Sequence, residues 1–322
     1  MTNTLSGRDL ISINDFSLEE MQLVMETAHG AEATYIEDRG RLREMLPDSI
    51  MAALFFEASL RTNTSFEAAM YRLGGQVTAY KDAGKTTKAS VGETLYDMGR
   101  MLDGYVDIAV IRHSGEGSAA ALAEGASIPI INGGDGKQEH PTQTLLDLYT
   151  MMRYFLLPRL EDLRGKRVAL VGDLKHGRTV HSLGMALARL GVTIDLVSLP
   201  SLAMPADYLS FFEQQGATVM FTSNFPEALY EADVLYMTRT QKERIEDPDE
   251  RAALEMSPLV LTRELYETSG AHGIILHPLP RVDEISRNVD ALEQALYFKQ
   301  AENGLYVRIA LLLLLLGVTP EF

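Results

Sequence analysis

The sequence predicts an α/β protein of two domains, each with a parallel sheet flanked by helices. Short apolar runs of strand length alternate with stretches in which apolar residues recur every three or four positions. This alternation is typical of parallel sheets that helices cover on both faces. The chain has 322 residues, more than one average domain needs. The alternation also restarts after residues 157–165, where Pro158 and Gly165 interrupt it.

The interruption sets the predicted domain boundary. We expect a first domain at residues 1–155, with C-terminal helices at 289–322 packing back on it, and a second domain at 156–288. No long linker separates the two domains, so we expect them to pack closely. Ligand sites are common at domain interfaces, and the functional site is therefore predicted in the interdomain cleft.

The expected elements of the first domain follow from its apolar spacing. Ser17 and Glu20 form a capping box that opens the first helix. Pro141 stands where the first turn of a helix accepts proline. Strands are expected at residues 50–56, 107–111 and 128–131, and further helices at 64–73, 92–103, 117–125 and 141–155.

The second domain shows the same alternation. A helix is predicted at residues 179–190, and Gly191 ends it. Strands are predicted at residues 167–171, 193–197, 234–237 and 273–276, with a helix, a further strand and a helix between the second and third of them.

The composition restricts the class of protein. There is no cysteine, which excludes disulfides and thiolate metal sites and fits the cytoplasm. The net charge of −16 disfavours a nucleic-acid partner, but converging arginines can still create a local positive field for small anions. The apolar run 309–316 is too short to cross a membrane, which takes about 20 residues. Residues 1–8 do not resemble a signal peptide, so we predict a cytoplasmic protein without a membrane partner.

A phosphate-binding turn is predicted between the first strand and its helix. A helix N-terminus offers unpaired backbone N–H groups and a partial positive charge. Ser59, Arg61 and Thr62 add hydroxyl donors and a guanidinium at the same place. The same residues also fit a helix cap beside a surface arginine, and the turn alone does not decide between the two interpretations.

Two further segments of the first domain carry candidate residues. Arg112 follows a strand end, where open α/β sheets bind ligands, although it also fits a surface basic pair with His113. A glycine-rich loop from Asn132 leads to His140, which could donate a hydrogen bond to an oxyanion, and to Gln143, which could hold an amide. A flexible turn with a helix cap explains this loop equally well.

Arginines follow three strand ends of the second domain. Arg178 stands at a helix start and suits a carboxylate; the preceding turn lacks the Gly-x-Gly-x-x-Gly spacing of dinucleotide sites. Arg239 follows the next strand end, with Gln241 two residues further on. Arg281 follows Leu279 and Pro280, and the prolines around Leu279 leave its carbonyl available to a ligand amine.

The inventory of arginines, amide donors and one histidine indicates a type of chemistry. No histidine cluster has metal-ligand spacing, and no Gly-x-Ser-x-Gly nucleophile turn occurs in the sequence. Such a set suits group transfer between two small anions by positioning and electrostatics.

Six segments of the sequence have the form of known motifs: Phe55-Phe-Glu-Ala-Ser59, the segment 132–148, Val171-Gly-Asp-Leu-Lys175, Gly177-Arg-Thr-Val-His-Ser-Leu183, Tyr236-Met-Thr-Arg-Thr-Gln-Lys-Glu-Arg244 and His277-Pro-Leu-Pro-Arg-Val-Asp-Glu284. They resemble the motifs of the aspartate/ornithine carbamoyltransferase family along nearly the whole chain. Pro278 after His277 favours the aspartate branch, because the ornithine branch has cysteine at that place.

The resemblance implies transfer of the carbamoyl group of carbamoyl phosphate to L-aspartate, in pyrimidine biosynthesis and without a metal or cofactor. It also implies a homotrimer in which each site borrows a loop from the neighbouring subunit; whether a regulatory subunit or another pathway enzyme binds stays open. Carbamoyl phosphate would be bound by Ser59, Arg61, Thr62, Arg112, His140, Gln143 and the carbonyls of Leu279 and Pro280, with Arg61, Thr62, Arg112 and His140 catalytic, and aspartate by Arg178, Arg239 and Gln241.

Three positions depart from the family pattern. Leu60 replaces a hydroxyl residue, Asn63 replaces an arginine, and Val91 stands where the borrowed loop has a lysine. Loss of one preorganised donor costs on the order of 100- to 1000-fold in rate. Lys85 or Lys88 could substitute only if the loop takes a different path. Three hypotheses stay open: an active enzyme, an impaired or inactive subunit with a binding or assembly role, and a carbamoyltransferase with another acceptor.

Overall fold

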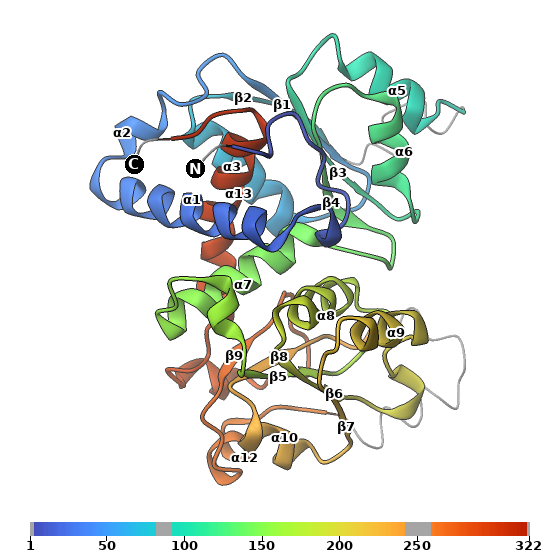
Figure 1. Cartoon of the computed structure of the whole chain (residues 1–322), viewed down its shortest axis with the longest axis vertical. Coiled ribbons are helices and arrows are strands. Elements are labelled where there is room, and N and C mark those ends of the chain that lie inside the picture. Colours follow the sequence, from blue (N-terminus) through green and yellow to red (C-terminus); the bar gives the residue numbers. More distant parts are fainter. Residues whose placement is uncertain (1–2, 82–91, 242–258, 321–322) are drawn as a thin grey trace. The chain divides into compact units, whose positions relative to one another are not determined.

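The structure, a computed structural model, describes residues 3–81, 92–241 and 259–320. It divides into two compact units (Figure 1). Unit 1 comprises Met1–Tyr149 and Glu302–Phe322, and unit 2 comprises Thr150–Ala301. Each unit contains a parallel sheet flanked by helices, which confirms the predicted fold class.

The sheet of unit 1 has the strand order β2-β1-β3-β4. Its strands are β1 (Ile50–Phe55), β2 (Gln76–Lys81), β3 (Ile108–His113) and β4 (Ile130–Asp135). All neighbouring strands are parallel, and Phe55 pairs with Arg112. The carboxyl ends of β1 and β3 therefore lie next to each other.

Helices cover both faces of this sheet. Helix α3 packs on β1 and β2, whereas α6 packs on β3 and β4. Ala52 and Leu54 of β1 belong to the apolar cluster with α5 and α6, as expected because alternate side chains of a strand face opposite sides. The helices are η1 (Ile13–Asp15), α1 (Leu18–Glu37), α2 (Arg39–Leu42), α3 (Leu60–Arg72), α5 (Leu95–Leu102), α6 (Ser118–Gly125), α7 (Pro141–Phe155) and α13 (Tyr297–Leu315).

The sheet of unit 2 has the strand order β7-β6-β5-β8-β9, again with parallel neighbours. Helices α8 and α9 lie on one side of it, and α10 and α12 lie on the other (Figure 1). The strands are β5 (Arg167–Val171), β6 (Thr193–Val197), β7 (Val219–Thr222), β8 (Val234–Met237) and β9 (Ile274–Leu276), and the helices are η3 (Leu160–Leu163), α8 (Arg178–Leu190), η4 (Pro200–Leu202), α9 (Ala206–Gln214), α10 (Phe225–Glu231), α12 (Arg263–Thr268) and η6 (Arg287–Ala291).

The structure corrects the sequence analysis at three elements. The helix expected at 64–73 begins at Leu60, with Ser59 as an extended N-cap residue, so its polar first turn looked like a loop. Strand β2 was not predicted, because this short edge strand has no continuous apolar run like those that indicated the other strands. Strand β4 also continues to Asp135 through glycines that indicated a loop.

The C-terminal apolar run forms part of the core of unit 1. Residues 309–315 lie in α13 with at most 1% of any side chain exposed. Among the helices in the described part of the chain, none is long and apolar enough to span a membrane.

A buried charge pair links α13 to α7 within unit 1. Arg308 is 3% exposed and its guanidinium lies 5.1 Å from the ring centroid of Phe66. Burial lowers the pKa of Arg308 to about 10, and the charge of Asp147, which is fully buried, opposes this shift. At neutral pH Arg308 therefore stays charged, and each charge compensates the other.

We predict that Arg308→Met lowers the free energy of unfolding by about 3–5 kcal/mol, because it leaves the charge of Asp147 buried without compensation. Adding Asp147→Asn should recover most of this loss, and Arg287→Met, at an exposed position, should change little. Urea unfolding of the three variants measures the effect. Additive losses in the double variant would contradict the pairing.

Candidate active site

The turn from β1 into α3 carries three of the predicted phosphate ligands. Ser59 is the N-cap residue, and its side chain makes no capping hydrogen bond to the helix. Arg61 and Thr62 lie in the first helical turn, where backbone N–H groups lack intrahelical partners. Burial lowers the pKa of Arg61, but arginine normally titrates so far above neutrality that the group remains charged. The turn thus offers a charge, hydroxyls and N–H groups together.

Thr62, His140 and Arg112 are brought together, although they lie far apart in the sequence. Thr62 Oγ1 and His140 Nε2 are 3.4 Å apart, and both residues are buried. Arg112 donates from Nη1 to the Gly133 carbonyl at 3.2 Å. A Cβ at Gly133 would lie 3.6 Å from Thr62 Cγ2, so Gly133 lies between these groups. Glu57, 3.5 Å from Arg112 Nε, completes the cluster with a carboxylate.

Gln143 lies in the first turn of α7 and is held by a carboxylate. Its Nε2 donates to Asp147 Oδ1 at 2.8 Å, and both side chains are buried. This bond fixes the amide so that nitrogen faces Asp147, which leaves Oε1 as the end that can accept from a ligand. Gln143 is thus oriented as an acceptor for an N–H group.

In unit 2, one buried carboxylate accepts hydrogen bonds from Gln241 and from the turn that precedes α8. Asp173, fully buried, accepts from the backbone N–H of His176 at 3.0 Å and from that of Gln241 at 3.1 Å. Gln241 Nε2 donates in turn to the His176 carbonyl at 2.7 Å. The ends of β5 and β8 are therefore tied together beside Arg178, the first residue of α8.

Arg178 and Arg239 are both half-buried at strand ends of the same sheet. Arg239 directly follows Thr238, whose N–H and hydroxyl both donate to the Val171 carbonyl, at 2.8 and 3.0 Å. His181 is buried, and its Nε2 lies 2.8 Å from the Leu174 carbonyl.

Leu279 and Pro280 lie in the loop after β9. Leu279 has a left-handed backbone, with φ of 56°. Its N–H donates to His277 Nδ1 at 2.7 Å, and Pro280 is exposed.

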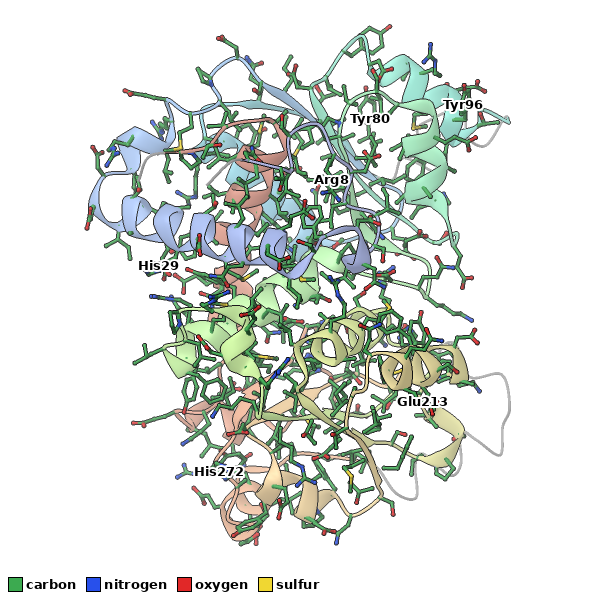
Figure 2. The ribbon with its side chains drawn as sticks, in the orientation of Figure 1. Arg8, His29, Tyr80, Tyr96, Glu213 and His272 are labelled. Atoms are coloured by element: carbon green, nitrogen blue, oxygen red, sulfur yellow. The ribbon has the colours of Figure 1, made fainter. Side chains whose placement is uncertain are left out.

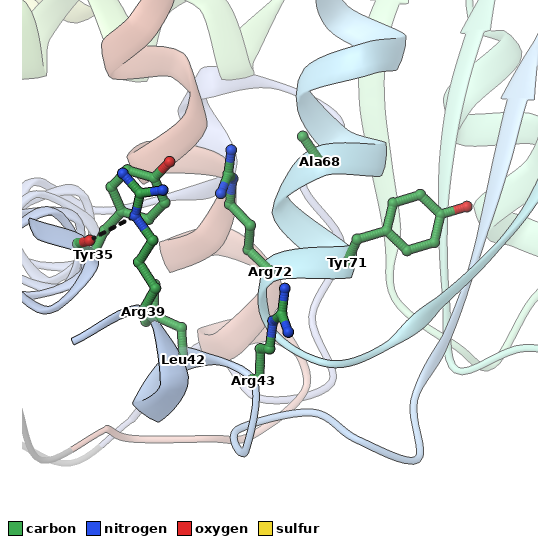
Figure 3. A pocket seen from close by; sticks show the side chains of 7 residues that line it. All are labelled: Tyr35, Arg39, Leu42, Arg43, Ala68, Tyr71 and Arg72. Atoms are coloured by element: carbon green, nitrogen blue, oxygen red, sulfur yellow. Dashed lines mark hydrogen bonds between the residues drawn. The ribbon is translucent and has the colours of Figure 1, made fainter.

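A separate basic hollow of about 310 Å³ lies in unit 1 and contains none of the predicted site residues (Figure 3). Three arginines line it, and the guanidinium groups of Arg39 and Arg72 lie 4.4 and 4.6 Å from the ring centroid of Tyr35. The other lining residues are Leu42, Arg43, Ala68 and Tyr71. This hollow is therefore distinct from the β1–α3 turn.

Two further findings concern possible metal ligands and the predicted borrowed loop. Within residues 3–81, 92–241 and 259–320, no group of three or more His, Cys, Asp or Glu side chains could hold a metal ion. Val91, Lys85 and Lys88 of the predicted borrowed loop lie outside the described residues.

Two family models match the chain in succession. The aspartate/ornithine carbamoyltransferase carbamoyl-P binding domain matches residues 8–153. The aspartate/ornithine carbamoyltransferase Asp/Orn binding domain matches residues 164–315. The chain belongs to the aspartate/ornithine carbamoyltransferase family.

Relatives within this family are similar over almost their whole length. The aspartate carbamoyltransferase catalytic subunit of Methanopyrus kandleri is 46% identical over 318 residues, covering 98% of this chain and 99% of the relative. The solved catalytic subunit of M. jannaschii aspartate transcarbamoylase is 43% identical, with a TM-score of 0.84 over 95% of this chain and 96% of its own. The Trypanosoma cruzi aspartate transcarbamoylase, solved with carbamoyl phosphate and aspartate, is 36% identical, with a TM-score of 0.88 over 98% of each chain.

Three carboxylates that orient residues of these motifs were not predicted from the sequence. Asp147, Asp173 and Glu284 all lie in the motifs that resemble this carbamoyltransferase family, but no role was assigned to them. The sequence did hold a signal for them, because each is an acidic residue within a segment predicted to bind an anion. A carboxylate is unfavourable in such a place unless it orients a hydrogen-bond donor.

Proposed function

We propose that this chain transfers the carbamoyl group of carbamoyl phosphate to the amine of L-aspartate, which yields N-carbamoyl-L-aspartate, a pyrimidine precursor, and phosphate. The convergence of Thr62, Arg112 and His140 next to the N-terminus of α3 carries this proposal. The names of the relatives support it, because they are aspartate carbamoyltransferases.

The phosphate half of the reaction falls to unit 1. Ser59, Arg61 and the N–H groups at the start of α3 bind the phosphate. Thr62, Arg112 and His140 donate to the carbonyl oxygen, where negative charge grows as the amine attacks the carbon. The bond from that carbon to the phosphate oxygen then breaks, and the phosphate leaves with the proton of the amine.

The acceptor half falls to unit 2. Arg178 and Arg239 bind the two carboxylates of aspartate, and Gln241 is held for the same task by Asp173. The carbonyls of Leu279 and Pro280 accept from the carbamoyl amide, as does Oε1 of Gln143. All of these interactions position the two anions, and positioning can supply about 7–11 kcal/mol of a bimolecular barrier.

A turnover assay for carbamoyl aspartate tests the activity, and a pair of arginine variants tests the assignment. Arg239→Ala should lower the affinity for succinate, a dicarboxylate without the reacting amine, by about 30-fold or more. Its affinity for phosphate should stay almost unchanged. Arg61→Ala should do the reverse. Calorimetric titration of each variant with both ligands measures the split, and equal loss of both ligands in either variant would reject it.

We expect the three departures from the family pattern, at Leu60, Asn63 and Val91, to change the rate of the reaction more than its type. The relatives reported above favour an active enzyme over an inactive subunit, because each is a named carbamoyltransferase. Leu60 is 80% exposed, whereas Asn63 is buried and donates to Glu67 at 2.9 Å. Replacing Leu60 with threonine therefore disturbs no packing. A panel of amine acceptors checks whether another amine replaces aspartate.

We predict that Val91→Lys raises the rate of carbamoyl aspartate formation by about 100-fold if the missing lysine limits catalysis. The triple variant Leu60→Thr, Asn63→Arg, Val91→Lys should gain more, because it also restores the phosphate turn. The matched variant is Lys88→Ala. If it abolishes activity in the natural chain, Lys88 has taken over the role of the lysine and our account of Val91 is wrong.

We also propose that the chain is a cytoplasmic homotrimer whose subunits exchange the loop at 82–92. Large aromatic side chains exposed on unit 1 support an interface there. Tyr80 and Tyr96 are 37% and 46% exposed (Figure 2), and Tyr71 and Tyr105 are more exposed still. Light scattering at micromolar concentration should give a trimer, and a stable monomer would count against the exchange.

A further inference from the structure

The loop after β9 is closed on itself by one histidine and one glutamate. His277 and Glu284, seven residues apart, are 1% and 5% exposed. His277 Nε2 and Glu284 Oε1 are 2.7 Å apart. The backbone N–H of His277 donates to Gln300 Oε1 at 2.8 Å, and Gln300 is itself 1% exposed. The imidazole is thus fixed at its backbone and at its ring.

The hydrogen bonds determine which ring nitrogen carries the proton. The Leu279 N–H donates to His277 Nδ1 at 2.7 Å, so Nδ1 must be an unprotonated acceptor. Nε2 then bears the hydrogen and donates it to the carboxylate of Glu284. In this neutral tautomer both ring nitrogens have partners, whereas a proton on Nδ1 would oppose the N–H of Leu279.

Glu284 is built into the loop as an anion. Besides the ring, its carboxylate accepts from the N–H groups of Val282 and Asp283, both at 3.2 Å. Burial raises the pKa of Glu284, but the hydrogen bond from His277 and the bonds from the backbone outweigh it and hold the pKa below its usual value. The carboxylate is therefore charged at neutral pH and orients the imidazole.

The imidazole in turn holds a backbone conformation that leucine rarely adopts. Leu279 has φ of 56°, which a residue other than glycine seldom adopts without support. The direction of the Leu279 carbonyl, and of the Pro280 carbonyl after it, depends on this conformation. Without the bond to Nδ1, the loop loses a contact that favours this conformation.

We propose that Glu284 and His277 are a positioning pair that aims the Leu279 and Pro280 carbonyls at the amide of carbamoyl phosphate. The pair selects a substrate with two N–H donors over an acyl phosphate of the same shape without them. The inference rests on the proposed function, because it assumes that these carbonyls meet the carbamoyl group. Neither residue contacts the reacting atoms; they act through the loop.

Acetyl phosphate is the matched probe, since a methyl group replaces the amino group of the carbamoyl moiety while the carbonyl and the phosphate are unchanged. In Glu284→Ala the KM for carbamoyl phosphate should rise by about 10- to 30-fold, the value of one or two lost hydrogen bonds. The inhibition constants of acetyl phosphate and inorganic phosphate should stay within about two-fold of wild type. Glu284→Gln keeps an acceptor oxygen for the ring N–H and should retain most of the selectivity.

Glu293→Ala, a change at an exposed glutamate, is the control and should match wild type. If Glu284→Ala does not fold, Glu284→Asp withdraws the carboxylate by one methylene and should shift selectivity in the same direction. Equally weakened binding of carbamoyl phosphate, acetyl phosphate and inorganic phosphate would overturn the positioning role alone. Unchanged selectivity in a folded variant would do the same. A wild-type chain that neither turns over nor binds carbamoyl phosphate would overturn the proposed function as well.

Discussion

In a parallel sheet the carboxyl ends of all strands lie along the same edge. The chain beyond that edge must find hydrogen-bond partners for its backbone N–H and carbonyl groups. Both sheets of this chain use that edge for the residues that we assign to anions. The pairing of Phe55 with Arg112 brings the β1–α3 turn beside Arg112. In unit 2, Gly172 has φ of 115°, and a Cβ there would lie 2.6 Å from the Thr238 carbonyl. Only glycine allows the β5 and β8 turns to approach so closely.

Buried carboxylates make this arrangement rigid. Asp147 holds Gln143, Asp173 holds Gln241, and Glu284 holds His277, each by a hydrogen bond of 2.7–3.1 Å. A buried carboxylate is unfavourable unless donors surround it, so each one enforces the orientation of the side chain or backbone that it binds. This explains how a chain with a net charge of −16 can carry sites for anions. Hydrogen-bond donors surround its buried carboxylates, while arginines stand at the strand ends.

Leu60 and Asn63, the two departures from the family pattern in the phosphate turn, differ in how much the surrounding structure depends on them. Leu60 is 80% exposed, and nothing in the structure explains its presence at the first turn of α3. Asn63 is 7% exposed and tied to Glu67, so its side chain is part of the packing of α3. Its Oδ1 is nevertheless buried without a hydrogen-bond partner, which is a cost that this position carries in the described structure.

The sequence by itself determined the fold class and the position of most strands and helices, because apolar periodicity reports directly which faces are buried. It also singled out Thr62, Arg112 and His140, since residue type and place after a strand end are local properties. Only the tertiary structure decided that α3 begins at Leu60 and that β2 forms, because polar first turns and edge strands gain their partners from distant segments. The same holds for the tautomer of His277, which depends on Glu284 and Leu279: hydrogen-bond direction is set by three-dimensional neighbours, and no spacing along the chain encodes it.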